Sequence, residues 1–162
     1  MEQLSFDFVV VGGGMSGMVS AASCAENGLK VTLISASKAP VSRGGSNNGV
    51  YSKIMEEMGI PRMDPTWFYR KEYLANGGNF KPALWYKFYN NSEEAMNWTC
   101  DLMEKAGYSI DIEIGTPDDE NSLYLQRTAA VGWNLNGQEP PEEGLEIVTG
   151  KMQPLLVYEL AR

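Results

Sequence analysis

Residues 7–28, with the sequence DFVVVGGGMSGMVSAASCAENG, decide the predicted fold. Phe8–Val11 is a run of four apolar residues, three of them β-branched, which favours a strand buried on both faces of a parallel sheet. A glycine-rich turn and a helix follow, and Val31–Ile34 provides a second apolar strand. This order of strand, glycine turn, helix and strand is typical of a β-α-β dinucleotide-binding unit.

The glycine turn fits the pattern G-x-G-x-x-G. The first glycine permits the tight turn, the second lets the backbone approach a pyrophosphate, and the third lets the helix pack against the strand. The helix N-terminus would then bind the phosphates. The candidate pyrophosphate-binding residues are Gly12, Gly13, Gly14, Met15, Ser16 and Gly17.

The predicted boundaries are a first strand at about 7–11, a helix at about 15–27 and a second strand at about 30–35. Asn27-Gly28 is expected to end the helix, because glycine readily adopts the left-handed conformation found after helix C-termini. Gly17, Ala21 and Ala25 recur every four positions, so we expect them to form a ridge of small residues close to the sheet.

The composition excludes several classes of function. The chain has 162 residues, a net charge of −8 and 43% apolar residues, which is a globular composition and argues against nucleic acid or an anionic membrane as partner. It contains no histidine, so His-based catalysis and the usual metal sites are not expected. Two cysteines far apart, without a C-x-x-C motif, suit buried free thiols in a reducing, cytoplasmic compartment. No secretory or membrane-spanning segment is evident.

The end of the second strand departs from the usual dinucleotide pattern. An acidic residue is typical there, because it binds the adenosine ribose hydroxyls, but Ser35 stands 23 residues after Gly12. Three interpretations remain open. Ser35 could form a single neutral hydrogen bond with ribose, it could bind a 2′-phosphate together with Ser37 and Lys38, or the segment could be a polar exit from the strand.

The next segment, 39–49, is rich in turn-forming residues and carries one arginine. Its glycine N–H groups can form an anion-binding concavity, and the guanidinium can pair with a pyrophosphate through two hydrogen bonds. Because it follows a predicted dinucleotide-binding unit directly, we predict that it contributes to the same site. With the end of the second strand, its candidate cofactor-binding residues are Ser35, Ala36, Ser42, Arg43, Gly44, Gly45, Ser46, Asn47 and Asn48.

Four stretches together resemble the N-terminal part of the FAD-binding domain in the fumarate reductase/succinate dehydrogenase flavoprotein family. They are DFVVVGGGMSGM at 7–18, SRGGSNNG at 42–49, DPTWFYRKEYLANGGNFKPALWYKFYNNSEEAMNW at 64–98, and GKMQPLLVYELAR at 150–162. The resemblance implies an α/β, Rossmann-like FAD/NAD(P)-binding domain, with a parallel sheet and flanking helices. It also implies that 42–49 wraps the pyrophosphate and the flavin.

The remaining elements follow from local signals. Asp64-Pro65 should begin one helix and Pro82 a second, and Asn91 with Glu94 suggests a capping box that begins a third helix ending at Gly107. A strand is expected from Ile110, a turn at 116–121, a short strand at 123–126, a long loop at 129–145 and a helix at 152–162. The predicted parts are 1–35 (βαβ unit), 36–63 (flavin and pyrophosphate loop), 64–107 (helical), 108–148 (extended, near a cap junction) and 149–162 (helix).

The resemblance implies an FAD-dependent oxidoreductase that transfers hydride to or from a C–C double bond of a small-molecule substrate. FAD should bind without a covalent link, because no histidine is present to attach it. We expect the chain to be the N-terminal part of such a domain, with no catalytic residue and no metal ligand of its own, and with a partner chain or a missing C-terminal half covering its open faces. The alternatives are an NADP-binding reductase and a non-catalytic nucleotide-binding or interaction module.

Overall fold

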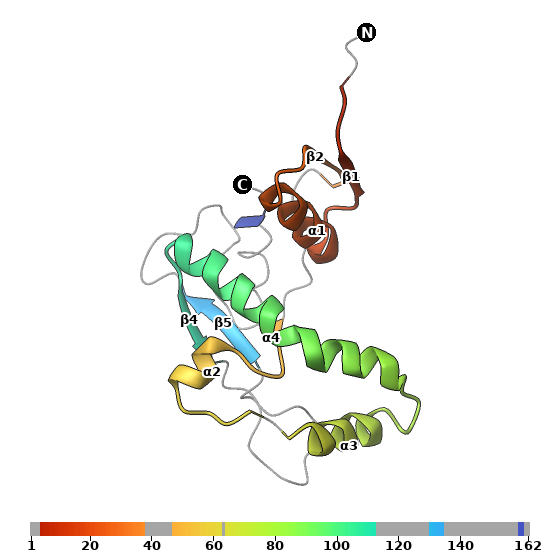
Figure 1. The fold of residues 1–162 in the computed structure, drawn as a ribbon, viewed down its shortest axis with the longest axis vertical. Helices are drawn as coiled ribbons and strands as arrows, with labels where there is room; N and C mark the ends of the chain where they lie inside the picture. Colours follow the sequence, from red (N-terminus) through yellow and green to blue (C-terminus); the bar gives the residue numbers. More distant parts are fainter. Residues whose placement is uncertain (1–3, 38–46, 63, 113–129, 135–158, 161–162) are drawn as a thin grey trace. The chain divides into compact units, whose positions relative to one another are not determined.

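The computed structural model describes residues 4–37, 47–62, 64–112, 130–134 and 159–160 (Figure 1). The chain forms two compact units, and each is described by itself. The first comprises residues 1–45 and 140–162, and the second comprises residues 46–139.

The first unit contains the predicted β-α-β arrangement. Strand β1 (Phe8–Val11) is followed by helix α1 (Met15–Glu26) and strand β2 (Val31–Ile34), each within about one residue of the predicted bounds. The two strands are parallel, and their register places Phe8 opposite Val31 and Val11 opposite Ile34. Figure 1 shows α1 lying beside this pair of strands. The mixed α/β class and the Rossmann-like unit are therefore confirmed.

The end of α1 is fixed by the predicted Asn27-Gly28 pair. Asn27 is the C-cap, and Gly28 has a φ of +81°, which an L-residue adopts only with strain. The Gly28 N–H donates to the Ala25 carbonyl at 2.9 Å, and the Leu29 N–H donates to the Cys24 carbonyl at 3.2 Å. This pair of bonds is a Schellman motif, which satisfies two of the carbonyls left free at the helix end.

Strand β1 is not buried on both of its faces, contrary to the prediction. Val10 is 8% exposed, whereas Val9 is 51% and Val11 is 81% exposed. The physical reason is that, among the described residues, α1 covers only the face to which Val10 belongs. The predicted ridge of small residues on α1 is also incomplete, because Gly17 and Ala21 are half-buried but Ala25 is exposed.

The second unit combines a helical hairpin with a three-stranded antiparallel sheet. The order of its strands is β3-β5-β4. Its elements are β3 (Asn47–Asn48), α2 (Lys53–Glu57), α3 (Pro65–Ala75), α4 (Pro82–Lys105), β4 (Ser109–Ile112) and β5 (Ala130–Asn134).

The sheet corrects one prediction and leaves others outside the described residues. Residues 130–134 form β5 instead of loop, with Trp133 opposite Ile110 and Val131 opposite Ile112. Val131 and Trp133 alternate along the strand and are both almost fully buried, so burial stabilises this strand despite the glycine between them. The turn at 116–121 and the strand at 123–126 lie outside the described residues. Of the helix predicted at 152–162, only Glu159 and Leu160 are described, and both are helical.

Helix α4 is one continuous helix, although two helices were predicted from Pro82 to Gly107. Asn91 does not cap a new helix, because its side-chain Nδ2 donates to the carbonyl of Lys87 one turn earlier, at 2.6 Å. The predicted start of α3 is confirmed, since the Asp64 carboxylate accepts a hydrogen bond from the Trp67 N–H at 2.8 Å.

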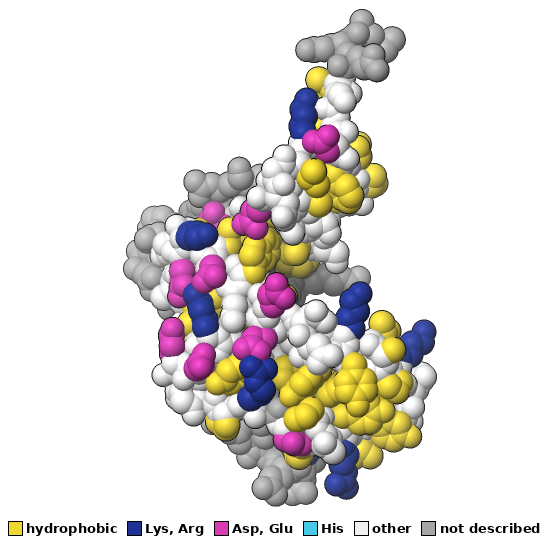
Figure 2. Space-filling view, viewed as in Figure 1, with side chains coloured by type: hydrophobic (Ala, Val, Ile, Leu, Met, Phe, Trp, Pro, Cys, Tyr) yellow, Lys and Arg dark blue, Asp and Glu magenta, His cyan; other side chains and the backbone are white. Residues whose placement is uncertain are grey.

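Aromatic side chains hold α3 against α4. Phe68, Trp85 and Val50 form a buried cluster, and the rings of Phe68 and Trp85 lie 5.6 Å apart. Not every large apolar side chain of these two helices is buried. Leu84 and Phe88 of α4 are exposed, although the ring of Phe88 still lies 6.3 Å from that of Phe68, and Figure 2 shows a broad hydrophobic area over this unit.

Cys100 lies on the buried side of α4, with no exposed surface. Burial raises the pKa of its thiol to about 11, so the reactive thiolate is scarce at neutral pH. In a Cys24→Ser variant, we expect the remaining thiol to react with iodoacetamide about a hundredfold more slowly in the native than in the denatured chain. The matched Cys100→Ser variant should react faster, because Cys24 is only half-buried. Rapid native alkylation of Cys100 would contradict the described packing.

Candidate functional site

The candidate site begins where β1 turns into α1. Gly12 has a φ of +116°, and its N–H donates to the carbonyl of Ile34 at 2.8 Å, extending the pairing of the two strands by one residue. A side chain at this φ would strain the backbone, so the sharp turn requires glycine. The turn therefore leaves the sheet at the carboxyl ends of two parallel strands, which is where open α/β sheets bind ligands.

Gly17 is the position at which the helix and the turn approach most closely. A Cβ added there would lie 2.0 Å from the Gly12 carbonyl oxygen and 3.4 Å from Val10 Cγ1. The first distance is far below any real carbon–oxygen contact, and the obstructing atom belongs to the backbone. The third glycine of the motif thus has its predicted role, because only glycine allows α1 to pack this close to β1.

Gly13 and Ser35 lie side by side at the end of the sheet. A Cβ on Gly13 would lie 2.8 Å from Ser35 Oγ and 3.0 Å from Ser35 Cβ. The structure therefore brings together the glycine turn and the residue predicted to contact ribose. Ser35 Oγ also accepts a hydrogen bond from the Ser37 N–H at 3.2 Å, which orders the start of the segment containing the exposed Ala36.

The N-terminus of α1 has the electrostatic character that a phosphate requires. Gly14 is the N-cap, has no side chain with which to cap the helix, and has a φ of −88°. Met15 and Ser16 follow in the first turn, which contains no acidic residue. The first N–H groups of a helix have no intrahelical acceptor and carry the positive end of the helix dipole, so an anion is favoured here.

The second group of predicted site residues is described only in part. Residues 42–46 lie outside the described residues. Asn47 and Asn48 form β3 and pair with Val131 and Ala130 of β5. They belong to the second compact unit, so their role in a site with the glycine turn stays a prediction.

Sequence reasoning missed the residues that anchor the chain directly after 42–48, within the predicted flavin and pyrophosphate loop at 36–63. The buried Ser92 Oγ of α4 accepts a hydrogen bond from the Val50 N–H at 3.0 Å. Gly49 packs so tightly on the same helix that a Cβ would lie 2.4 Å from Met96 Cγ. One turn further along, Asn97 Oδ1 accepts from the Lys53 N–H at 2.8 Å. The sequence signal that could have pointed to this anchor is Ser92, a small hydroxyl residue among the aromatic and charged residues of α4.

The anchoring continues through Lys53 at the start of α2, a helix that the sequence analysis did not predict. Ser52 caps α2 by accepting from the Met55 N–H at 3.4 Å. The Lys53 Nζ forms ion pairs with Asp101 and Glu104 of α4, and its hydrogen bonds to these carboxylates raise the pKa of Lys53. The segment after β3 is thus attached to α4 at three successive turns.

The described part of the chain shows neither a metal site nor a membrane-crossing helix. It contains no group of three or more acidic, cysteine or histidine side chains that could hold a metal ion. No described helix is long and apolar enough to cross a membrane.

A parallel strand pair joined through this glycine turn and helix defines the class of the protein, a dinucleotide-binding β-α-β protein. A family model for the FAD binding domain matches residues 7–128, which is more than half of the chain. The chain therefore belongs to the FAD-binding domain family of the fumarate reductase and succinate dehydrogenase flavoproteins. No curated protein gives a significant match to the sequence.

Proposed function

We propose that this chain binds FAD non-covalently and serves as the cofactor-binding part of a flavin-dependent oxidoreductase. The observation that carries the proposal is the contact between Gly17 and Gly12, which places the first turn of α1 directly at the end of β1. Membership of a family of flavin oxidoreductase domains supports FAD as the dinucleotide. When bound, the flavin would supply hydride transfer to or from a C–C double bond of a small substrate.

The chain's own residues would bind and orient the cofactor. The N–H groups at the start of α1 would hold the pyrophosphate, because Gly14 at the N-cap has no side chain to cover them. Ser35 would donate a hydrogen bond to ribose beside Gly13. Residues 42–48 would contact the pyrophosphate and flavin, with Arg43 as the cation. Proton transfer to substrate is assigned to no residue of this chain.

The first test is the visible absorbance of the protein after incubation with FAD and desalting. Retained flavin bands, lost to the supernatant on acid precipitation, are expected for non-covalent FAD. FMN should bind about tenfold or more weakly, because it lacks the adenosine diphosphate part that the glycine turn would hold. A protein that retains no FAD but binds NADPH would overturn the proposal.

The variant Ser35→Asp is expected to change the affinities for FAD and for NADPH in opposite directions. A carboxylate at this position accepts hydrogen bonds from both ribose hydroxyls, so we expect FAD affinity to rise about tenfold. The same charge would repel a 2′-phosphate and weaken NADPH binding. Ser23→Asp is the matched control, because it adds the same charge at an exposed position near the end of α1, away from the glycine turn. Titration of both variants by flavin fluorescence checks the result, and tighter NADPH binding by Ser35→Asp would contradict it.

A further inference from the structure

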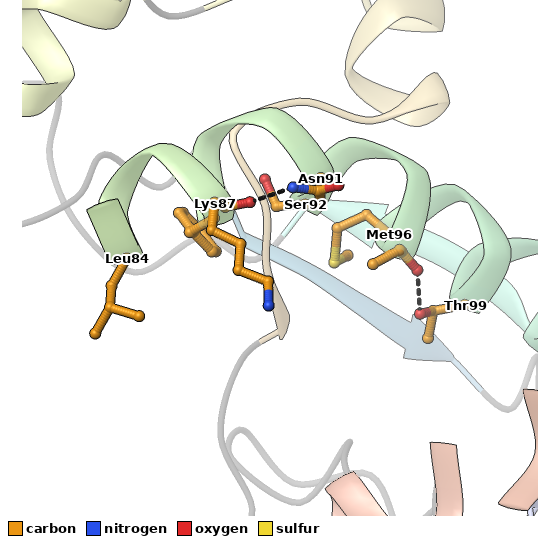
Figure 3. Close-up of a pocket in the computed structure, with 8 residues that line it drawn as sticks. Leu84, Lys87, Asn91, Ser92, Met96 and Thr99 are labelled. Atoms are coloured by element: carbon orange, nitrogen blue, oxygen red, sulfur yellow. Dashed lines mark hydrogen bonds between the residues drawn. The ribbon is translucent and has the colours of Figure 1, made fainter. Parts of the chain in front are cut away.

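An open groove of about 460 Å³ runs along one side of α4 (Figure 3). Its described lining comes from α4 alone, between Leu84 and Thr99. Leu84 is 63% exposed and Phe88 is 37% exposed, although both are large apolar residues. The groove is therefore a helix face with apolar side chains in water, and such a face is unusual unless something binds to it.

The exposed residues of this face have the spacing of a helix-pairing seam. Leu84, Phe88, Asn91 and Ala95 follow one another at intervals of four, three and four, and Thr99 comes four residues later. Intervals of three or four residues keep side chains on one stripe of a helix, as in coiled coils. The stripe covers about 24 Å of helix at 1.5 Å per residue. Figure 3 shows Leu84, Met96 and Thr99 along this side of α4.

We propose that this face pairs in antiparallel orientation with the same face of a second copy of the chain. The stripe is self-complementary about a point next to Asn91. An antiparallel copy centred there places Phe88 opposite the other copy's Ala95, so a large ring meets a small side chain. Leu84 lies opposite the other copy's Thr99 in the same arrangement. A two-fold axis requires this kind of self-matching surface.

The charges on α4 are also complementary in this orientation. Lys87 lies before the centre of the stripe and Glu94 after it, whereas Glu93 and Asp101 lie on other sides of α4 and already pair with Arg62 and Lys53. Antiparallel pairing brings Lys87 of each copy towards Glu94 of the other, whereas parallel pairing would place like charges at the same height. Lys87 and Glu94 flank the stripe on the same side, and neither forms an ion pair among the described residues. Two Lys87–Glu94 pairs would form per dimer.

Asn91 would set the register. It is exposed, lies next to the symmetry axis, and its Nδ2 is already bound to the Lys87 carbonyl. A single polar residue within an apolar seam is known to fix register and oligomeric state at a cost in affinity. With a seam this short, the interface is at the small end of stable interfaces, so we expect a micromolar dissociation constant.

Sedimentation velocity over a concentration series tests the proposal. A reversible species of twice the 17.9 kDa chain mass is expected. Ala95→Arg should weaken the dimer about a hundredfold, because it fills the space for Phe88 with a charged side chain. Lys87→Glu should weaken it about tenfold through like-charge contacts, and the double variant Lys87→Glu/Glu94→Lys should restore it.

Two control variants carry matched charge changes elsewhere. Arg70→Glu on α3 and Glu57→Lys on α2 alter exposed residues outside the stripe and should leave dimerisation unchanged. A protein that stays monomeric at every concentration would overturn the proposal. A dimer that is insensitive to both Ala95→Arg and the charge exchange would overturn it as well. FAD retention does not enter these measurements, so this inference and the proposed function fail separately.

Discussion

Replacing Gly17 by alanine is expected to weaken the proposed FAD binding strongly and to destabilise the β-α-β unit. The new methyl group would lie 2.0 Å from the Gly12 carbonyl oxygen, so α1 or the turn must move. Neither movement leaves the first turn of α1 at the end of β1. We expect the FAD dissociation constant to rise about a hundredfold or more, and the free energy of unfolding to fall by about 2 kcal/mol or more. Flavin fluorescence titration and urea denaturation measure the two effects.

Gly14→Ala separates cofactor binding from folding in the same turn. Among the described residues, no atom beyond the adjoining backbone lies within 4 Å of a Cβ at Gly14, and its φ of −88° is accessible to alanine. We therefore expect this variant to fold normally but to bind FAD more weakly, because its methyl group would stand where the pyrophosphate approaches. Ser20→Ala, on an exposed position of α1, should affect neither property. If Gly17→Ala binds FAD as the unaltered chain does, the close contact is not what forms the site.

Truncating Phe68 to alanine will cost about 3–5 kcal/mol of unfolding free energy. Phe68 is 1% exposed and lies among Trp85, Phe88 and Tyr89, so its loss leaves a cavity between two helices that cannot easily close. The measurement is urea denaturation followed by tryptophan fluorescence, which reports on the neighbouring Trp85.

Tyr73→Ala provides the comparison for Phe68. Tyr73 lies on the same helix and stacks on Tyr69, but it is 46% exposed, against 1% for Phe68. We expect a loss of less than about 1 kcal/mol, because little apolar area leaves a buried environment. Equal losses in the two variants would show that the hairpin is not held together at Phe68.

The first unit could be predicted from the sequence because its signals are local. The glycine spacing, the apolar runs and Asn27-Gly28 each determine backbone conformation within a few residues, and together they located β1, α1 and β2 to about one residue. The extent of burial could not be predicted in this way. An apolar run such as Val9–Val11 indicates a strand, but what covers each face depends on elements far away in the sequence.

The fold of the second unit could not be predicted in this way, because it depends on contacts between residues that are far apart in the sequence. Strand β5 forms because Val131 and Trp133 pair with β4 and are buried, and glycine and asparagine around them gave a loop signal instead. Helix α4 passes through Asn91 and Ser92, two residues that also begin helices. Ser92 is used there to hold Val50, which lies 42 residues earlier in the sequence. The candidate site shows the same division, since Ser35 beside Gly13 was expected and the attachment of Gly49 to α4 was not.

The uninterrupted course of α4 has a mechanical consequence. With 24 residues it is a rod of about 36 Å, and its hydrogen-bonded backbone resists bending. Trp85 near one end is seated in the aromatic cluster, and Ser92 and Asn97 further along hold the backbone of Val50 and Lys53. A tilt of this helix at its aromatic end is therefore expected to displace the backbone of Val50 and Lys53. Substitutions around Trp85 can in this way displace the start of α2, which lies outside the aromatic cluster.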